Sequence, residues 1–576
     1  MNSKLMLLAI FICAVLQPAF AQTPAAVEKP STSRDGTITG RVTSDGQPLR
    51  DVQVAAIAVN AKVGGIIPTT CDEEGNFKLT GLRPGAYRLL AIMPGYVSRQ
   101  ASDAELYRAG DQVTINMVKG GVITGRVTDA AGDPIPAVRV TPVLIRDLTG
   151  KRANSFSSLE NLGRSGRLTD DRGIYRLFGL HPGVYIVSVN GSANDLTDIS
   201  ETPAFESPTY HLSATRDTAT EISVGESAEV TGVDIRHRGE RGRTVSGTLS
   251  GETTGDALIN AVSILLKSAT TGQIEAMAVT MGSSGFALHG VPNGEYDLVG
   301  VRFNESNDQA ASRPRRISVR GADISGIELK LLNLGSIAGK IVIEKAEPAK
   351  ACEVKETYTV QEISLSANRE DQKGGEQNSS LNIFDLAGGL PRSAPGEKGE
   401  FTLKNLEAGS YRLAADLPGE TWYIRGITQP GIGATKRTDA ARLPFGLKQG
   451  EKLSGLEITI AEGAASLSGR VIAAKEGQTL PPRLIVHLIP AEVTAADEVL
   501  RYREAVSGQS DSFEFKHLAP GKYWLLARPA SAGEANSMKT AFDPIQRAKL
   551  RREAEAAKNE IELKPCARVK DSMLRF

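Results

Sequence analysis

The stretch GNFKLTGLRPGAYRL, residues 75–89, decides the fold of this chain. Apolar side chains take alternate positions on both sides of its centre, starting from Phe77 before it and Tyr87 after it, which is the period of a strand with one buried face. Between the two runs, the ring of Pro84 fixes its φ at about −65°. Gly85 follows it and tolerates the positive φ that a type II turn needs at its third position. The stretch therefore predicts a β-hairpin with a buried aromatic residue on each arm.

The same spacing recurs through the chain. An aromatic residue is followed ten positions later by a tyrosine that lies two residues after a glycine, in the pairs Phe77–Tyr87, Tyr175–Tyr185, Phe286–Tyr296, Phe401–Tyr411 and Phe513–Tyr523. The glycine is common to all five copies and the proline is not, which favours a backbone requirement over a chemical one. Successive tyrosines are about 100 residues apart, which is an ordinary domain size.

Further strands keep step with this repeat. An opening strand with a glycine before its apolar run precedes each copy, as in Gly40-Arg41-Val42, and a closing strand follows the first four, as in Val113–Met117. The fifth copy lacks an obvious closing strand. Many short alternating strands separated by turn residues, with almost no helical periodicity, predict an all-β tandem array of about five antiparallel sandwiches.

The repeated segments set the expected domain limits. We call the five repeats modules 1 to 5, at residues 36–119, 120–239, 240–333, 334–462 and 463–532. Modules 2 and 4 contain insertions, at 197–215 and 369–380, for which recognition loops and tolerated insertions are both open interpretations.

The two ends of the chain differ in character from the modules. Residues 1–21 have a positive start at Lys4, an apolar stretch and a small-x-small cleavage site, so they are predicted to be a secretory signal, followed by a flexible leader over 22–35. Asp543 and Pro544 supply an N-cap and a first-turn proline, and a short C-terminal helix is predicted within a tail over 533–576.

Charge and cysteine content narrow the class of protein. Lysine plus arginine equals aspartate plus glutamate at 67, which argues against nucleic acid or an anionic membrane as partner. After signal cleavage no segment reaches the ~20 apolar residues of a membrane span. Cys71, Cys352 and Cys566 then remain, an odd number spread over the chain, and whether any two of them pair stays open. We expect an exported protein that is periplasmic, secreted or at the cell surface.

Together these segments resemble a known family. Gly-Arg-Val, a second alternating strand, Gly-x-Phe/Tyr-x-Leu and Leu-x-Pro-Gly-x-Tyr look like the carboxypeptidase regulatory-like domain, a transthyretin-like (Ig-like) β-sandwich. Modules 1 and 2 match best, through 40–42 with 75–89 and 125–127 with 173–187. The resemblance implies seven-stranded sandwiches with a non-catalytic accessory or binding role, similar to folds grouped with carbohydrate-binding sandwiches, and found in exported bacterial proteins.

Three aromatic residues are the candidate ligand-binding residues. Trp524 lies between Tyr523 and Leu525, so if those two point into the core the indole points outward, where it could stack on a sugar ring. Trp422 and Tyr423 follow a Pro-Gly pair and are expected to be partly exposed. The alternative is that these aromatics pack against a neighbouring module or the terminal tail.

An enzyme finds little support in the sequence. His237-Arg238-Gly239-Glu240 has the His-x-x-Glu spacing of metallocarboxypeptidase zinc ligands, but six histidines in a charged chain produce one such spacing by chance. No nucleophile elbow, phosphate-binding loop or paired-cysteine motif is present. We predict no catalytic residue, metal or cofactor.

Three functions from different classes follow. The first is an exported, non-catalytic binding, adhesion or scaffold protein of the cell envelope, with carbohydrate as the ligand class suggested by the resemblance and the aromatics. The second is a structural spacer or protein-interaction module that works with an envelope receptor or enzyme. The third is a zinc hydrolase that uses His237.

Overall fold

The structure is a computed structural model. It describes residues 36–59, 65–98, 105–148, 150, 167–189, 206–251, 261–270, 274–281, 283–303, 309–344, 352, 358–370, 392–431, 437–474, 479–481, 483–507, 511–530 and 542–576. The predicted secretory signal and leader, most of the insertion at 369–380 and the first part of the insertion at 197–215 lie outside these residues.

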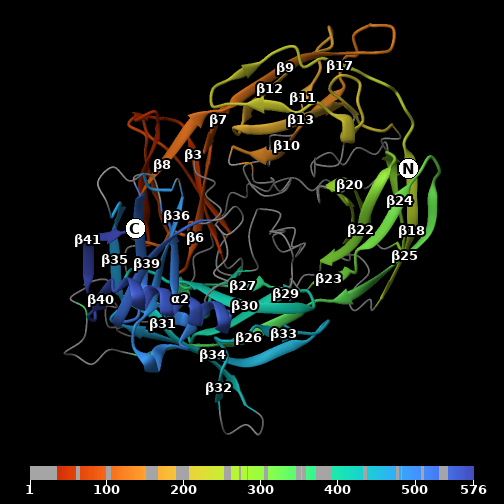
Figure 1. Cartoon of the computed structure of the whole chain (residues 1–576). Coiled ribbons are helices and arrows are strands. Elements are labelled where there is room, and N and C mark those ends of the chain that lie inside the picture. Colours follow the sequence, from red (N-terminus) through yellow and green to blue (C-terminus); the bar gives the residue numbers. More distant parts are fainter. Residues whose placement is uncertain are drawn as a thin grey trace, which may run out of the picture. The chain divides into compact units, whose positions relative to one another are not determined.

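The fold class predicted from the sequence is confirmed. Strands run through almost all of the described chain, and the helix α2 (Pro544–Ala557) lies near its end (Figure 1). Five hydrophobic cores are each centred on the strands of one predicted module, including Phe77 and Tyr87 in module 1 and Phe513 and Tyr523 in module 5. The core of module 5 also includes Leu563 and Leu574 from the predicted tail. The structure is therefore a series of β-sandwiches, although the limits of the modules themselves stay predictions.

Modules 1 and 2 each contain two hydrogen-bonded layers. In module 1 the first layer holds β1 (Ile38–Ser44), β2 (Gln47–Pro48), β5 (Asn76–Leu79), β7 (Tyr96–Ser98) and β8 (Gln112–Lys119), and the second holds β3 (Gln53–Ala58), β4 (Ile66–Thr70) and β6 (Tyr87–Ile92). In module 2 the first layer holds β9 (Gly121–Thr128), β12 (Ile174–Leu180), β16 (Glu229–Val230) and β17 (Ile235–Arg236), and the second holds β10 (Arg139–Asp147), β11 (Arg167–Leu168), β13 (Gly183–Val189), β14 (Thr209–Tyr210) and β15 (Ile222–Val224).

Module 3 differs because its strands form one continuous hydrogen-bonded sheet. The order is β20-β19-β22-β23-β25-β18-β21, and β24 pairs with β22. These strands are β18 (Arg243–Gly251), β19 (Ala261–Ser268), β20 (Ile274–Met281), β21 (Gly285–Val291), β22 (Gly294–Phe303), β23 (Gln309–Ser312), β24 (Arg315–Val319) and β25 (Ile324–Asn333).

Modules 4 and 5 return to two layers. Module 4 has β26 (Gly335–Glu344), β29 (Glu400–Leu406), β31 (Trp422–Pro430), β32 (Arg437–Asp439) and β34 (Lys452–Glu462) in one layer, and β27 (Ser364–Arg369), β28 (Arg392–Ser393), β30 (Gly409–Asp416) and β33 (Phe445–Leu447) in the other. Module 5 has β35 (Ala465–Ile472), β38 (Ser512–Leu518) and β41 (Arg568–Arg575) opposite β36 (Leu484–Pro490), β37 (Arg503–Val506), β39 (Gly521–Pro529) and β40 (Glu560–Leu563).

The aromatic pair does not form the predicted hairpin. In module 1 the strand of Phe77 pairs with β1, whereas the strand of Tyr87 pairs with β3 in the other layer. Both side chains are buried, at 4% and 2% exposure, in the same core. The segment between them therefore crosses from one sheet to the other, so that the two rings enter the core from opposite sides.

The expected type II turn is also wrong. Positive φ is found four residues before the glycine of the repeat, at Gly81 (75°), Gly179 (70°), Gly290 (71°), Asn405 (63°) and His517 (55°). In modules 2 to 5 the strand that carries the first aromatic residue of the pair is hydrogen-bonded to the opening strand, and the register of this pairing shifts at the residue with positive φ. This residue is therefore a β-bulge. A bulge bends a strand, which starts the crossing between sheets.

The repeated tyrosine stabilises this crossing. In each module its hydroxyl donates to the carbonyl oxygen four residues earlier, in the bonds Tyr87 to Arg83 (2.7 Å), Tyr185 to His181 (2.7 Å), Tyr296 to Pro292 (3.0 Å), Tyr411 to Glu407 (2.9 Å) and Tyr523 to Ala519 (2.6 Å). The ring is buried while its polar end holds the corner, in the manner of the tyrosine corner of other sandwiches.

The opening-strand glycine makes room for the aromatic of the first arm. A Cβ atom on Gly40 would lie 2.6 Å from the Phe77 ring, and on Gly469 it would lie 2.9 Å from the Phe513 ring. The same atom would lie 2.0 to 2.4 Å from a carbonyl oxygen of the closing strand in all five modules. No other residue fits at this position without moving the backbone, which explains why glycine recurs there.

Antiparallel pairing alone does not describe the sheets. In every module the opening strand pairs in parallel with the closing strand, in the pairs β1 with β8, β9 with β17, β18 with β25, β26 with β34 and β35 with β41. The chain crosses to the other sheet and back between these two strands, so it can return in the same direction.

The predicted helical tail needs a correction. The helix is present, and the Asp543 side chain accepts hydrogen bonds from the backbone amides of Ile545 (2.8 Å) and Gln546 (3.2 Å) as expected of an N-cap. The residues after α2, however, form β40 and β41 and complete the sheets of module 5. The closing strand was missed because Ser572 stands opposite the opening-strand glycine, where modules 1, 3 and 4 have an apolar residue that starts the alternation.

Replacement of Tyr185 by Phe should destabilise module 2. The His181 carbonyl loses its donor while the ring still fills the core, so we expect a loss of about 1 kcal/mol. Amide hydrogen exchange of β12 and β13 measures it. Tyr423→Phe is the matched control, because within the described structure the hydroxyl of Tyr423 makes no hydrogen bond. An equal effect of both substitutions would contradict the role of the corner.

Candidate functional site

Trp422, the first predicted binding residue, lies in the core of module 4. Its side chain is 5% exposed, and its ring meets the edge of Tyr358 with centroids 6.1 Å apart. The expected partial exposure of Trp422 is therefore wrong, because β31 pairs with β34 and turns this residue toward the sandwich interior. Tyr423 is half-buried beside it, and burial raises the pKa of its hydroxyl.

Trp524 points away from the core of module 5, as the alternation predicts, but it is half-buried. Tyr523 and Leu525 are buried on one face, and on the other face the indole packs against a small cluster that includes Leu550 and Ala554 of α2. The Arg551 guanidinium lies 5.0 Å from the ring centroid. Packing by the terminal tail, the alternative to ligand binding, is confirmed for this residue.

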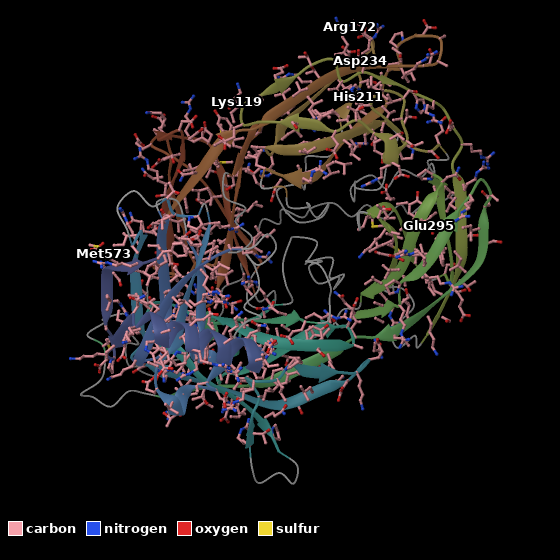
Figure 2. All side chains as sticks on the ribbon, in the orientation of Figure 1. Lys119, Arg172, His211, Asp234, Glu295 and Met573 are labelled. Atoms are coloured by element: carbon pink, nitrogen blue, oxygen red, sulfur yellow. A yellow bond between two sulfur atoms is a disulfide. The ribbon has the colours of Figure 1, made fainter. Side chains whose placement is uncertain are left out.

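The His-x-x-Glu pair does not converge. His237 Nε2 lies 2.9 Å from a Glu206 carboxylate oxygen and its Nδ1 lies 3.2 Å from Thr209 Oγ1, whereas Glu240 is bound by Arg238. In the described part of the chain, no three His, Cys, Asp or Glu side chains are grouped to hold a metal ion. Nearby His211, labelled with Asp234 in Figure 2, contacts the carbonyl oxygen of Asp234 at 2.7 Å, which is a structural contact.

The open question of cysteine pairing is answered by the structure. Cys352 and Cys566 form a disulfide with a Cα–Cα distance of 5.4 Å, and it joins module 4 to the loop between β40 and β41. Cys71 is a free thiol in the core of module 1. Burial, together with the charge of Asp72, raises the pKa of this thiol to about 11.

Buried polar contacts between neighbouring modules were missed by the sequence analysis. Arg216, in the short 3-10 helix η2 (Arg216–Thr218), forms an ion pair with Glu275 on β20, and the two side chains are 13% and 5% exposed. Burial raises the pKa of Glu275, although Arg216 opposes the shift. The segment that directly follows the insertion in module 2 thus contacts module 3.

Modules 3 and 4 are joined in a similar way. The amide of Gln309 donates to the Asn405 side-chain oxygen at 2.9 Å in a buried position, and Gln449 donates through Nε2 to the Asn333 carbonyl oxygen at 2.6 Å. One residue, Leu334, separates the last strand of module 3 from the first strand of module 4. Asn405 is also the left-handed bulge residue of module 4, so it both bends its own strand and contacts module 3.

Modules 4 and 5 are joined by several contacts. His517 Nδ1 donates to the Trp422 carbonyl oxygen at 2.9 Å, and the Arg568 side chain lies 3.2 Å from the carboxylate of Glu420. Burial lowers the pKa of His517, so the neutral ring is favoured at this contact. With the disulfide, these contacts connect the two modules at several separate points. No motif signals them, because each partner lies in a different repeat.

Comparison with known proteins identifies the first module. Residues 37–118 match the model of the carboxypeptidase regulatory-like domain, so the predicted resemblance is confirmed for module 1. A comparison with curated proteins found no match. Within the described residues, α2 and the short 3-10 helices are not long and apolar enough to cross a membrane.

Several solved structures are distantly similar to the chain. The Bacillus anthracis TIE protein is 12% identical with a TM-score of 0.14, and the match covers 85% of this chain and 70% of that one. The major pilin subunit BcpA of Bacillus cereus is 9% identical with a TM-score of 0.12, over 51% and 99%. The minor pilin of Streptococcus agalactiae is 15% identical with a TM-score of 0.18, over 35% and 95%.

The Cys71 thiol should resist alkylation in the folded protein. With a pKa raised to about 11, it stays protonated at pH 8 and is buried as well. Mass spectrometry of the chain that begins after Ala21, treated with iodoacetamide at pH 8 without reductant, should find no modification until denaturant is added and one afterwards. Rapid labelling of the native protein would contradict this environment.

Proposed function

We propose that the chain is an exported, non-catalytic scaffold of the cell envelope that holds its β-sandwich modules in fixed relation to one another. The observation that carries the proposal is the set of buried polar contacts between successive modules, above all the Arg216–Glu275 ion pair and the Cys352–Cys566 disulfide. Modules that are joined only by flexible linkers need no such contacts.

The energetics of these contacts support a rigid connection. Separation of modules 2 and 3 would leave Arg216 and Glu275 without the partner that compensates for their burial, and breaking a buried pair typically costs several kcal/mol. The disulfide closes a loop between residues 214 positions apart, and loops of this length restrict the unfolded chain strongly. Interfaces built this way favour one arrangement over many.

Two further observations support export. A disulfide persists in an oxidising compartment and is rare in the cytosol. The predicted secretory signal over residues 1–21 would direct the chain to such a compartment. The two features come from different parts of the chain and agree.

Carbohydrate binding loses support relative to the scaffold. Of the three aromatic residues on which it was predicted, Trp422 lies in the core, and the indole of Trp524 is partly covered by α2. Tyr423 and Trp524 each keep partial exposure. We therefore place the structural and protein-interaction role ahead of a sugar-binding role.

Distances between modules 2 and 3 test the scaffold. Spin labels at Arg172→Cys and Glu295→Cys, two side chains labelled in Figure 2, should give one narrow distance distribution by pulsed electron resonance in a Cys71→Ala background. Glu275→Gln should broaden it, because Arg216 is left buried without its counter-charge. Glu226→Gln, a change on module 2 away from this ion pair, is the control. A broad distribution in the parent protein would mean independent modules and would refute the scaffold.

Mechanical extension tests the disulfide. When the oxidised chain is pulled from its ends, the residues between Cys352 and Cys566 should not extend, and reductant should release about 75 nm, from 214 residues at roughly 3.5 Å each. Cys352→Ser should release the same length without reductant, and Cys71→Ser should not. Equal extension with and without reductant would mean that the bridge is not formed.

A further inference from the structure

Module 3 has an open edge between β24 and β25. β24 pairs with β22 on one side, and β25 pairs with β18 through residues 324–331, but β24 and β25 do not pair with each other. On its other side, among the residues that the structure describes, β25 is paired only at 331–333, with β23. A hollow of about 490 Å³ lies between the two strands and is lined by residues that include Arg315, Ser325, Gly326 and Glu328.

The corresponding edge of module 4 is occupied by the chain itself. The opening-strand glycines Gly247 and Gly339 face Ile327 and Leu456, so Glu328 of module 3 corresponds to Glu457 of module 4. In module 4, β31 pairs with β34 along the whole of 457–462. The same strand edge that is open in module 3 is thus closed by a β-hairpin in module 4.

An arginine of that hairpin completes the contact. Arg437 donates through Nη2 to the Gly455 carbonyl oxygen at 2.9 Å, and its Nε lies 3.9 Å from the Glu457 carboxylate. The Pro430 ring covers Gly455, since a Cβ atom there would lie 2.8 Å from Pro430 Cγ. In module 3, a Cβ atom on the equivalent Gly326 would meet nothing within 4 Å among the atoms the structure describes.

The lip of the hollow adds a charge requirement. Arg316 is bound by the Asp297 carboxylate at 2.6 and 2.9 Å, and Glu328 accepts a hydrogen bond from Ser250 at 2.8 Å. Arg315 on β24 is exposed and forms no ion pair within the described part of the chain. An occupant that carries a carboxylate opposite Arg315 and an arginine opposite Glu328 would match both charges.

We propose that module 3 binds an extended protein segment, which adds a strand to β25 and places an arginine against the Gly326 carbonyl and Glu328. Free strand edges bond to added strands through backbone groups, and side chains then set the specificity. The site gives the proposed scaffold a place to hold a partner, and its test is independent of module spacing because it measures peptide binding alone.

The probe is a synthetic peptide with the sequence of residues 422–439, which includes the arginine and an aspartate of the module 4 hairpin. We expect saturable binding to the full chain by fluorescence anisotropy, with new protection of the amides of 327–330 in hydrogen exchange. A peptide with Arg437→Ala should bind roughly tenfold more weakly, because it lacks the charged contact.

Variants of the protein locate the site. Arg315→Glu on the exposed lip should weaken binding of the peptide roughly tenfold, and Arg83→Glu on module 1 should not change it. Glu328→Gln gives a second test at the opposite lip. The proposal is overturned if no saturable binding is seen, or if the new protection lies on module 4 instead of 327–330. It is also overturned if the chain forms a dimer that Arg315→Glu dissociates, because the edge then binds a second copy.

Discussion

The hydrogen bond from a buried tyrosine hydroxyl to the carbonyl four residues earlier is the constraint on which the modules depend. It occurs in all five copies, with oxygen–oxygen distances of 2.6 to 3.0 Å. The bond holds the point at which the chain leaves one sheet and enters the other. The ring fills the core between the two sheets, and the hydroxyl holds the backbone where the chain crosses between them. One side chain therefore stabilises both the crossing and the packing of the sheets.

A second constraint acts from the opposite sheet. The ring of the preceding aromatic residue lies over the opening-strand glycine, where even a methyl group would collide with the ring and with the closing strand. The opening strand, the first arm and the closing strand therefore meet at one point in each module. Modules 3 and 4 show how the same plan is varied at its edge, since a hairpin closes β34 but no strand of the described chain closes β25 along 324–330.

Some contacts between modules use residues outside the repeat, and others use a position within it. Arg216 and Glu275 lie outside the repeated aromatic pair, and so do Cys352 and Cys566. His517 and Asn405 instead occupy the left-handed bulge position of the repeat and also contact the neighbouring module. Glycine holds this position in modules 1 to 3. In modules 4 and 5 the larger side chains adopt a strained left-handed backbone, and they form a contact with the neighbouring module that glycine cannot form.

The sequence by itself determined the all-β class, the five repeats, the opening strands and the helix cap at Asp543, because each depends on local periodicity or on backbone chemistry. It predicted a hairpin where the chain crosses between sheets, since alternation shows which face is buried but not which strand is the partner. It also missed β41, where Ser572 takes the place of an apolar residue. Only the tertiary structure decided how far Trp422 and Trp524 are buried, that Cys352 pairs with Cys566, and that module 3 has an open edge. Each of these depends on residues distant in sequence that meet only after the sheets have formed.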